Sequence, residues 1–94
     1  MGNYKYMRDN IKVYMGDMTP AELSRIIGLP AMTIHRVIGE ETIPRIDTVD
    51  RIAKGLKIPL PAIVCENELL RHLIIELFKM SPSELHAIKL LLKR

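Results

Sequence analysis

Residues 18–37 read MTPAELSRIIGLPAMTIHRV, and this stretch decides the fold. It begins with a helix start signal at Thr19, Pro20 and Glu22. The Thr19 hydroxyl can accept from a backbone N–H of the first turn, and Glu22 can reach back to the Thr19 N–H. Proline fits the first turn of a helix, where a backbone N–H has no intrahelical acceptor. These residues predict a helix that begins directly after Thr19.

The apolar residues that follow are spaced for two short helices with a glycine between them. The first stripe lies at steps of three and four and consists of Leu23, Ile26 and Ile27. Gly28 can adopt the left-handed conformation that ends a helix and turns the chain sharply. Leu29 begins the turn, and Ile34 with Val37 forms a second apolar stripe. This spacing predicts a helix-turn-helix unit, whose second helix has an outer face able to enter a DNA major groove.

The size and composition of the chain predict one small, soluble, cytoplasmic domain. The 94 residues are 48% hydrophobic and 27% charged, which suits a globular chain with its own core. The net charge of +3 permits an anionic partner without demanding one. A single cysteine cannot form an internal disulfide, and no Cys/His spacing suits zinc. No apolar run reaches the roughly 18 residues of a membrane span, and no signal-peptide or lipidation motif is present, so no membrane partner is expected.

Helical spacing and turn residues predict three further helices in the first two thirds of the chain. A first helix is expected over 4–15, and Gly16 ends it. A loop over 39–44 follows the helix-turn-helix, and its proline keeps the preceding residue out of a helix. A fourth helix is predicted over 46–56, and Pro59 opens a short turn of helix that follows it.

Two more helices are expected at the end of the chain. Asn67 is a suitable cap for a helix over 68–79, and the SPSE segment at 81–84 repeats the capping-box pattern for a helix that follows it. Apolar residues cover more of these helices than one packed face requires. The pair either forms an antiparallel hairpin closed on the core or pairs with a second copy. The chain is thus divided into a helix-turn-helix domain over 1–66, with its core at 18–39, and a helical hairpin over 67–94.

Residues 18–63 resemble the Cro and phage-repressor-type (XRE) family of helix-turn-helix proteins, without a gap. The matching landmarks, all in one register, are MT-x-x-EL, Gly28 with Leu29, Thr33-Ile34-x-Arg36-Val37, Pro44, Ile52-Ala53-Lys54-x-Leu56, Ile58-x-Leu60 and Ile63. This resemblance implies an all-α, lambda-repressor-like bundle of five helices whose third helix reads DNA. The two C-terminal helices are an extension outside the match. The resemblance also implies a cytoplasmic, nucleoid-associated protein of a bacterium or phage.

The resemblance implies that the third helix supplies the base contacts. Ala31 and Met32 occupy positions where the family commonly has polar base-reading residues. Neither side chain can donate a hydrogen bond, but both could press on thymine methyl groups. Thr33, His35 and Arg36 remain as polar candidates on the outer face. Of these, the Arg36 guanidinium can grip a guanine edge or a phosphate bidentately.

Phosphate contacts are expected near the starts of the second and fourth helices. The family's frequent glutamine at the start of the second helix is Pro20 here. The loop after the third helix, often basic in the family, carries Glu40 and Glu41, whose carboxylates oppose a phosphate backbone. Thr42, Arg45 and the N-terminus of the fourth helix could offset that repulsion. The full predicted DNA-binding set is Thr19, Ala31, Met32, Thr33, His35, Arg36, Thr42 and Arg45.

Several candidate side chains also have an interpretation without DNA. Arg36 can pair with Glu40, four residues later on the same helical surface. Met32 and His35 can be ordinary exposed residues, and Arg45 can be a plain loop charge. These alternatives stay open.

Three other residues are of types that bind metals or catalyse reactions. His72 and His86 fall on neighbouring predicted helices, so a metal pair is conceivable, but no acidic or thiol ligand is placed to complete it. Cys65 is most simply a small buried apolar residue. The sequence therefore predicts no metal site, no cofactor and no enzyme.

The sequence favours a double-stranded DNA-binding transcriptional regulator, expected to be a repressor and a homodimer formed through the C-terminal helices. The helix at about 31–38 would read the major groove. One alternative is a protein-interaction module or antitoxin-like partner binder on the same fold with weak or lost DNA binding. Ala31, Met32 and the acidic pair at 40–41 are consistent with it. The other alternative, ranked last, is an enzyme that uses histidine or cysteine.

Overall fold

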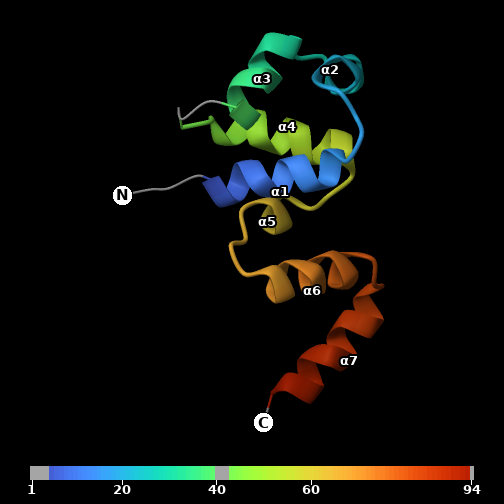
Figure 1. The fold of residues 1–94 in the computed structure, drawn as a ribbon. Helices are drawn as coiled ribbons and strands as arrows, with labels where there is room; N and C mark the ends of the chain where they lie inside the picture. The colour runs from blue at the N-terminus through green and yellow to red at the C-terminus, as the bar shows by residue number, and fades with distance from the viewer. Residues whose placement is uncertain (1–4, 40–42, 94) are drawn as a thin grey trace.

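The fold is all-helical, as the sequence predicts. The computed structural model describes residues 5–39 and 43–93, and this part of the chain contains helices and no strand. The helices are α1 (Lys5–Met15), α2 (Pro20–Ile27), α3 (Ala31–Gly39), α4 (Ile46–Leu56), α5 (Leu60–Ile63), α6 (Glu68–Phe78) and α7 (Pro82–Leu92). In Figure 1, α1 to α5 gather into one group, from which α6 and then α7 extend. None of the helices in the described ranges has the length and apolar character that a membrane span needs.

Local signals in the sequence set most of the helix boundaries. The capping box at Thr19 starts α2, and Gly28 ends it in the left-handed conformation with φ 74°. Gly16 follows α1 with φ 56°. The α4 helix has the predicted bounds, while Asn67 and a capping box at Ser81 begin α6 and α7. Each of these predicted starts and ends of helices is confirmed. They could be predicted because each depends on hydrogen bonds within a few residues.

Small differences from the predicted boundaries occur at helix ends. α3 continues through Gly39, which the sequence places at the start of a loop. α6 ends at Phe78, one residue early, because the Lys79 N–H bonds to a carbonyl only three residues back. The predicted first residue of the first helix, Tyr4, lies outside the described residues, as do residues 40–42 of the predicted loop.

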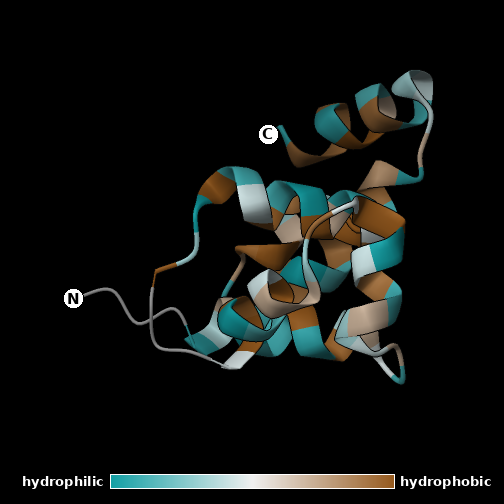
Figure 2. Cartoon of the chain, turned by 90° about the horizontal axis from the view of Figure 1, so that it is seen from above, coloured by the Kyte–Doolittle hydropathy of each residue, from teal (hydrophilic) through white to brown (hydrophobic). Residues whose placement is uncertain are grey.

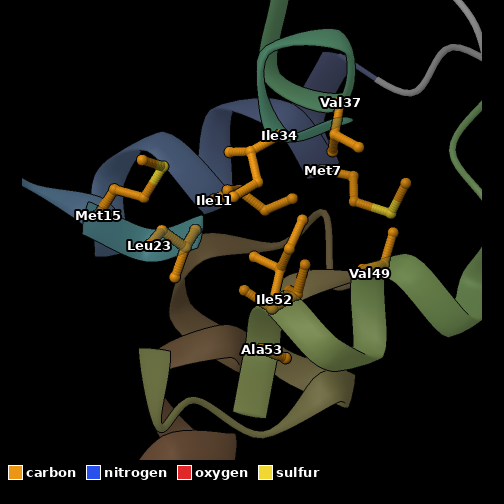
Figure 3. Close-up of a cluster of buried hydrophobic side chains, with 10 residues drawn as sticks. Met7, Ile11, Met15, Leu23, Ile34, Val37, Val49, Ile52 and Ala53 are labelled. Atoms are coloured by element: carbon orange, nitrogen blue, oxygen red, sulfur yellow. The ribbon is translucent and has the colours of Figure 1, made fainter. Parts of the chain in front are cut away.

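Aliphatic and methionine side chains from α1 to α5 form the core (Figure 3). The buried cluster consists of Met7, Ile11, Met15, Leu23, Ile34, Val37, Val49, Ile52, Ala53 and Ile63. Ile11, Leu23 and Ile34 are completely buried, and they come from three different helices. Burial of each such side chain stabilises the fold by about 1.5–3 kcal/mol. The core therefore locks α2 and α3 onto α1 and α4.

Two isoleucines that the sequence places on buried faces are exposed. Ile26 is 56% exposed, because Leu23 and Ile27, one full turn apart, carry the packed stripe of α2 and leave Ile26 at its edge. Ile46 begins the apolar stripe that the sequence predicts for the helix over 46–56, together with Val49 and Ile52. It is 63% exposed at the first position of α4, beyond the end of the core. Cys65 is half-buried instead of buried, and its thiol donates to the Asn67 carbonyl at 3.4 Å.

A polar network attaches α6 to the first helix. The amide nitrogen Nδ2 of Asn10 donates to the carbonyls of Ile63 and Cys65, at 2.8 and 3.0 Å. Its oxygen Oδ1 accepts from Nη1 of Arg71 at 2.8 Å, and Arg71 Nε donates to the Tyr14 hydroxyl at 3.0 Å. Both Asn10 and Arg71 are buried. This network ties the start of the C-terminal extension to α1.

The two C-terminal helices do not close together onto the core. α6 packs on α5, whereas α7 turns away from the bundle and lies at the end of the molecule opposite α3 (Figure 1). Within α7, no residue is buried. Figure 2 shows from above that α7 stands apart from the bundle and carries hydrophobic positions along its length. The apolar surface that the sequence assigns to this segment is therefore exposed in the single chain.

Candidate nucleic-acid interface

The α3 helix presents one face to the core and the opposite face to solvent. Ile34 and Val37 point from α3 into the core (Figure 3). Met32 is 61% exposed, and His35 and Arg36 are exposed as well. Because residues three and four apart share a helix face, anchoring the first pair turns the other three outward.

The five α3 candidates differ in how far they reach into solvent. Ala31 and Thr33 are half-buried, whereas the other three side chains are exposed. The Thr33 N–H donates to the Pro30 carbonyl at 2.9 Å, which begins the first turn of the helix. The outward surface thus offers an apolar thioether, an imidazole and a guanidinium, with smaller side chains beside them.

Three hydrogen bonds hold the turn that positions α3. The Gly28 N–H donates to the Ser24 carbonyl at 2.9 Å, and the Ser24 hydroxyl donates to the Leu29 carbonyl. From α4, Nη2 of Arg51 donates to the Ile27 carbonyl at 2.7 Å. The last carbonyls of a helix lack partners within the helix, so these bonds satisfy groups that the turn would otherwise leave open. They fix the direction in which α3 leaves α2.

The start of α2 is closed by a reciprocal pair of hydrogen bonds. The Thr19 hydroxyl accepts from the Glu22 N–H at 3.1 Å, and Glu22 Oε1 accepts from the Thr19 N–H at 2.8 Å. The bond from the Thr19 amide holds the pKa of the Glu22 carboxyl below its ordinary value, since it stabilises the charged form. Thr19 is exposed, and its hydroxyl, an acceptor in the cap, also carries a hydrogen able to donate outward.

Arg45 lies directly before α4 and pairs with a neighbouring carboxylate. Its Nε lies 3.2 Å from Oδ1 of Asp47. Both side chains are more than half exposed, and such pairs contribute about 0–1 kcal/mol. Arg45 can therefore leave Asp47 and bond to a DNA phosphate at little cost in free energy. Thr42, the remaining member of the predicted set, lies outside the described residues, as do Glu40 and Glu41.

The structure groups part of the predicted set and separates the rest. Ala31, Met32, Thr33, His35 and Arg36 share α3, while Thr19 begins α2 and Arg45 precedes α4. In Figure 1, α3 lies at the end of the molecule opposite α7. The C-terminal helices of the same chain therefore do not cover the outward face of α3.

The side chains that hold the turn before α3 could not be recognised from the sequence. Arg51 reads as one more exposed charge of α4, because its acceptor on Ile27 lies 24 positions away in the chain. Ser24 reads as a helix-surface residue, although it bonds across the turn. Asn10, which holds α6 and not α3, did offer a signal: it falls on the apolar stripe of α1, next to Ile11, where a polar residue needs a buried partner.

The two histidines of the C-terminal helices belong to no metal site among the described residues. His72 and His86 are exposed on α6 and α7. Among residues 5–39 and 43–93, no group of three or more His, Cys, Asp or Glu side chains is arranged to hold a metal ion.

Comparison of the chain with models of protein families, with curated proteins and with solved structures found no match.

Proposed function

We propose that this protein is a double-stranded DNA-binding transcriptional regulator, related to the Cro and phage-repressor-type (XRE) proteins that its sequence resembles. In this proposal α1 to α5 are the lambda-repressor-like bundle, and α3 is the recognition helix. The outward face of α3 carries the proposal: Ile34 and Val37 anchor it, while Met32, His35 and Arg36 are exposed. A helix held in this way fits the width of a B-DNA major groove.

Base contacts come from the exposed α3 side chains. The Arg36 guanidinium donates to O6 and N7 of a guanine, the most frequent specific contact in major grooves. Met32 and Ala31 lie against thymine methyl groups, and His35 and Thr33 bond to base edges or phosphates. With few donors on this face, Arg36 contributes most of the sequence preference.

Phosphate contacts set the position of the protein on the duplex. Thr19 and Arg45, at the starts of α2 and α4, and Thr42, three positions before Arg45 in the sequence, supply these contacts. They carry no sequence information and make binding fall as salt rises, because each neutralised phosphate releases counterions.

The regulator acts as a homodimer and as a repressor. Two copies place their α3 helices in successive major grooves, about 34–36 Å apart, so the preferred site is a near-palindrome. Binding over a promoter excludes polymerase. No catalytic step is part of this function.

A second function, a protein-interaction module or antitoxin-like partner binder, is favoured by one observation. Met32, on the outward face near the start of α3, is an apolar side chain that is 61% exposed. Methionine is frequent at protein-binding surfaces because it adapts its shape.

Selection of bound duplexes from a random pool, followed by affinity measurement across a salt series, separates the two functions. A DNA regulator enriches a two-fold sequence and loses affinity steeply as salt rises. If neither the selected nor the random duplexes bind at low salt, the DNA proposal is wrong and the interaction module takes its place.

A further inference from the structure

Two hollows lie side by side where α2, α4 and α6 end. The first has a volume of about 320 Å³ and lies between α2 and α4, and the second, of about 380 Å³, lies between α4 and α6. Lys54 and Lys57 line both hollows, so the two adjoin. In Figure 1 the C-terminal ends of these three helices lie along the same side of the molecule. The solvent-exposed lining residues form what we call the basic groove: Ile26, Arg51, Lys54, Lys57, Phe78 and Lys79.

The basic groove carries an excess of positive charge. Carboxylates of Asp50 and Glu76 pair with Lys54 and Lys79, at 3.1 and 3.3 Å, but pairs between such exposed side chains are weak and exchange readily. Arg51 bonds to a neutral carbonyl and keeps further guanidinium donors. Within the described ranges, no carboxylate forms an ion pair with Lys57. The groove can therefore accept additional carboxylates from another molecule.

Exposed apolar side chains flank these positive charges. Ile26 is 56% exposed beside the first hollow, and Phe78 is 62% exposed beside the second. The half-buried side chains of Ile27, Ile58 and Ile75 also line the hollows. A phosphate backbone would use the charges of this surface and leave its apolar side chains without a partner. A protein segment that carries both acidic and apolar side chains matches the two properties together.

Lys57, which lines both hollows, has a backbone conformation that lysine rarely adopts. Its φ is 61°, and among the described residues it is the only one other than glycine with a positive φ. Gly16 and Gly28 occupy the comparable positions after α1 and α2. Glycine would end α4 with less strain. Strained residues are frequent at functional sites, and here the strained residue brings an ammonium group to both hollows.

We infer that the basic groove binds an acidic amphipathic segment of a partner protein. Apolar side chains of this segment enter the two hollows, and its carboxylates pair with Lys54, Lys57 and Arg51. Clusters of basic side chains recognise acidic motifs, and apolar anchors in pockets supply much of the binding energy of such complexes. The described residues of α3 do not line the hollows, so the partner leaves the outward face of α3 uncovered. This inference does not depend on DNA binding by α3.

The lysines of the groove also lie where a helix dipole favours cations. The C-terminal end of a helix carries a partial negative charge, and Lys54 and Lys57 lie at the end of α4. A lysine that serves only the helix end should lower the stability of the fold when it is removed. A lysine that binds a partner should lower the affinity for that partner instead. Both quantities are therefore measured on the same variants.

The first experiment selects peptides from a displayed library of short random sequences on the full chain, without DNA. We expect the enriched peptides to combine Asp or Glu with apolar residues. The affinity of a selected, fluorescein-labelled peptide should fall about tenfold or more with Lys57→Glu and about fivefold with Phe78→Ala, as fluorescence polarisation measures. Both side chains are exposed, so these changes leave the core intact. Lys12→Glu, at an exposed position of α1, is the matched control and should bind the peptide like the wild type.

A second pair of variants separates the charge of Lys57 from its structural role. Lys57→Gly removes the ammonium and relieves the left-handed strain, so it should weaken peptide binding about tenfold while the thermal midpoint stays equal or rises. Lys57→Arg keeps the charge and should keep the affinity. Enriched peptides without acidic residues, peptide binding that survives Lys57→Gly, or a loss of binding in step with a loss of stability would overturn the inference. If Lys57→Glu weakens only duplex binding, the groove contacts phosphate and the inference is wrong. A chain that binds no DNA but binds acidic peptides through Lys57 would contradict the proposed function and leave this inference standing.

Discussion

Arg71 of α6 donates from Nη1 to Oδ1 of Asn10 in α1 at 2.8 Å, across 61 positions of the chain. Both side chains are buried, and Arg71 also bonds to the hydroxyl of Tyr14 at 3.0 Å. Its guanidinium carbon lies 6.0 Å from the centroid of the Tyr14 ring, within reach of a cation–π interaction. The guanidinium is thus held by two neutral acceptors, the Asn10 amide oxygen and the Tyr14 hydroxyl, and by the face of the Tyr14 ring. This contact ties α6 to α1, in addition to the packing of α6 on α5.

Removal of the Asn10 side-chain amide should therefore destabilise the protein. Asn10→Ala leaves Arg71 Nη1 and the carbonyls of Ile63 and Cys65 without their partner, at a cost of about 1–3 kcal/mol for each group that stays buried. Urea unfolding measures this loss. Lys12→Ala, at an exposed position of the same helix, is the control and should change stability by less than about 0.5 kcal/mol. Equal stability of the two variants would contradict a structural role for the network.

Gly55 marks the closest approach of α4 to α2. A Cβ atom at this position would overlap Cγ2 of Ile27, a branched side chain with little freedom to move. We expect Gly55→Ala to destabilise the fold by about 1–3 kcal/mol, although alanine is the better helix former. Gly39→Ala in α3, where a Cβ meets no atom within 4 Å, is the matched control. Thermal unfolding should move in opposite directions for the two variants, and a shift in the same direction would argue against the close approach.

Arg51 should strengthen DNA binding although it does not contact DNA, because its bond to the end of α2 holds the turn before α3. Arg51→Ala removes the donor to the Ile27 carbonyl and should cost about 0.5–1.5 kcal/mol of stability. Because this bond holds the turn before α3, the variant should also bind duplex DNA less tightly at unchanged salt dependence. Lys54→Ala, which removes a charge from the same helix and breaks only a surface pair with Asp50, is the control. A change in the salt slope would instead indicate that Arg51 contacts phosphate.

The contact made by Arg36 can be measured directly on a selected duplex. Arg36→Ala should weaken binding by about 1–3 kcal/mol and relax preference at one base pair if it bonds to a guanine edge. Lys79→Ala, which removes one positive charge at the end of α6, should have little effect on affinity. Equal losses for the two variants would indicate that overall charge, and not a base contact, drives binding.

Acid should weaken the start of α2 in a way that depends on Glu22. Hydrogen bonds from Thr19 lower the pKa of this carboxyl below its ordinary value of 4.5. A lowered pKa in the folded state contributes stability above the ordinary pKa, and that contribution is lost as pH falls through the lowered one. Glu22→Gln should therefore unfold more easily than the wild type at neutral pH and show a smaller further loss on acidification. Parallel pH–stability curves would contradict this assignment.

Much of the secondary structure could be predicted from the sequence, because its determinants are local. Thr19 with Glu22 starts α2, Gly28 ends it, and Ser81 with Glu84 starts α7, each through groups no more than five residues apart. The outward face of α3 was also predictable, since helical spacing alone places Ile34 and Val37 opposite the exposed side chains. The DNA contacts assigned to those side chains stay predictions.

The contacts between distant segments could not be predicted in this way. The bond from Arg71 to Asn10, the bond from Arg51 to Ile27 and the approach of Gly55 to α2 join residues that have no fixed spacing in the chain. The same holds for the C-terminal helices, whose sequence allowed both a closed hairpin and an exposed surface. Helix formation depends on neighbours within a turn or two, whereas helix packing depends on which distant side chains fit together.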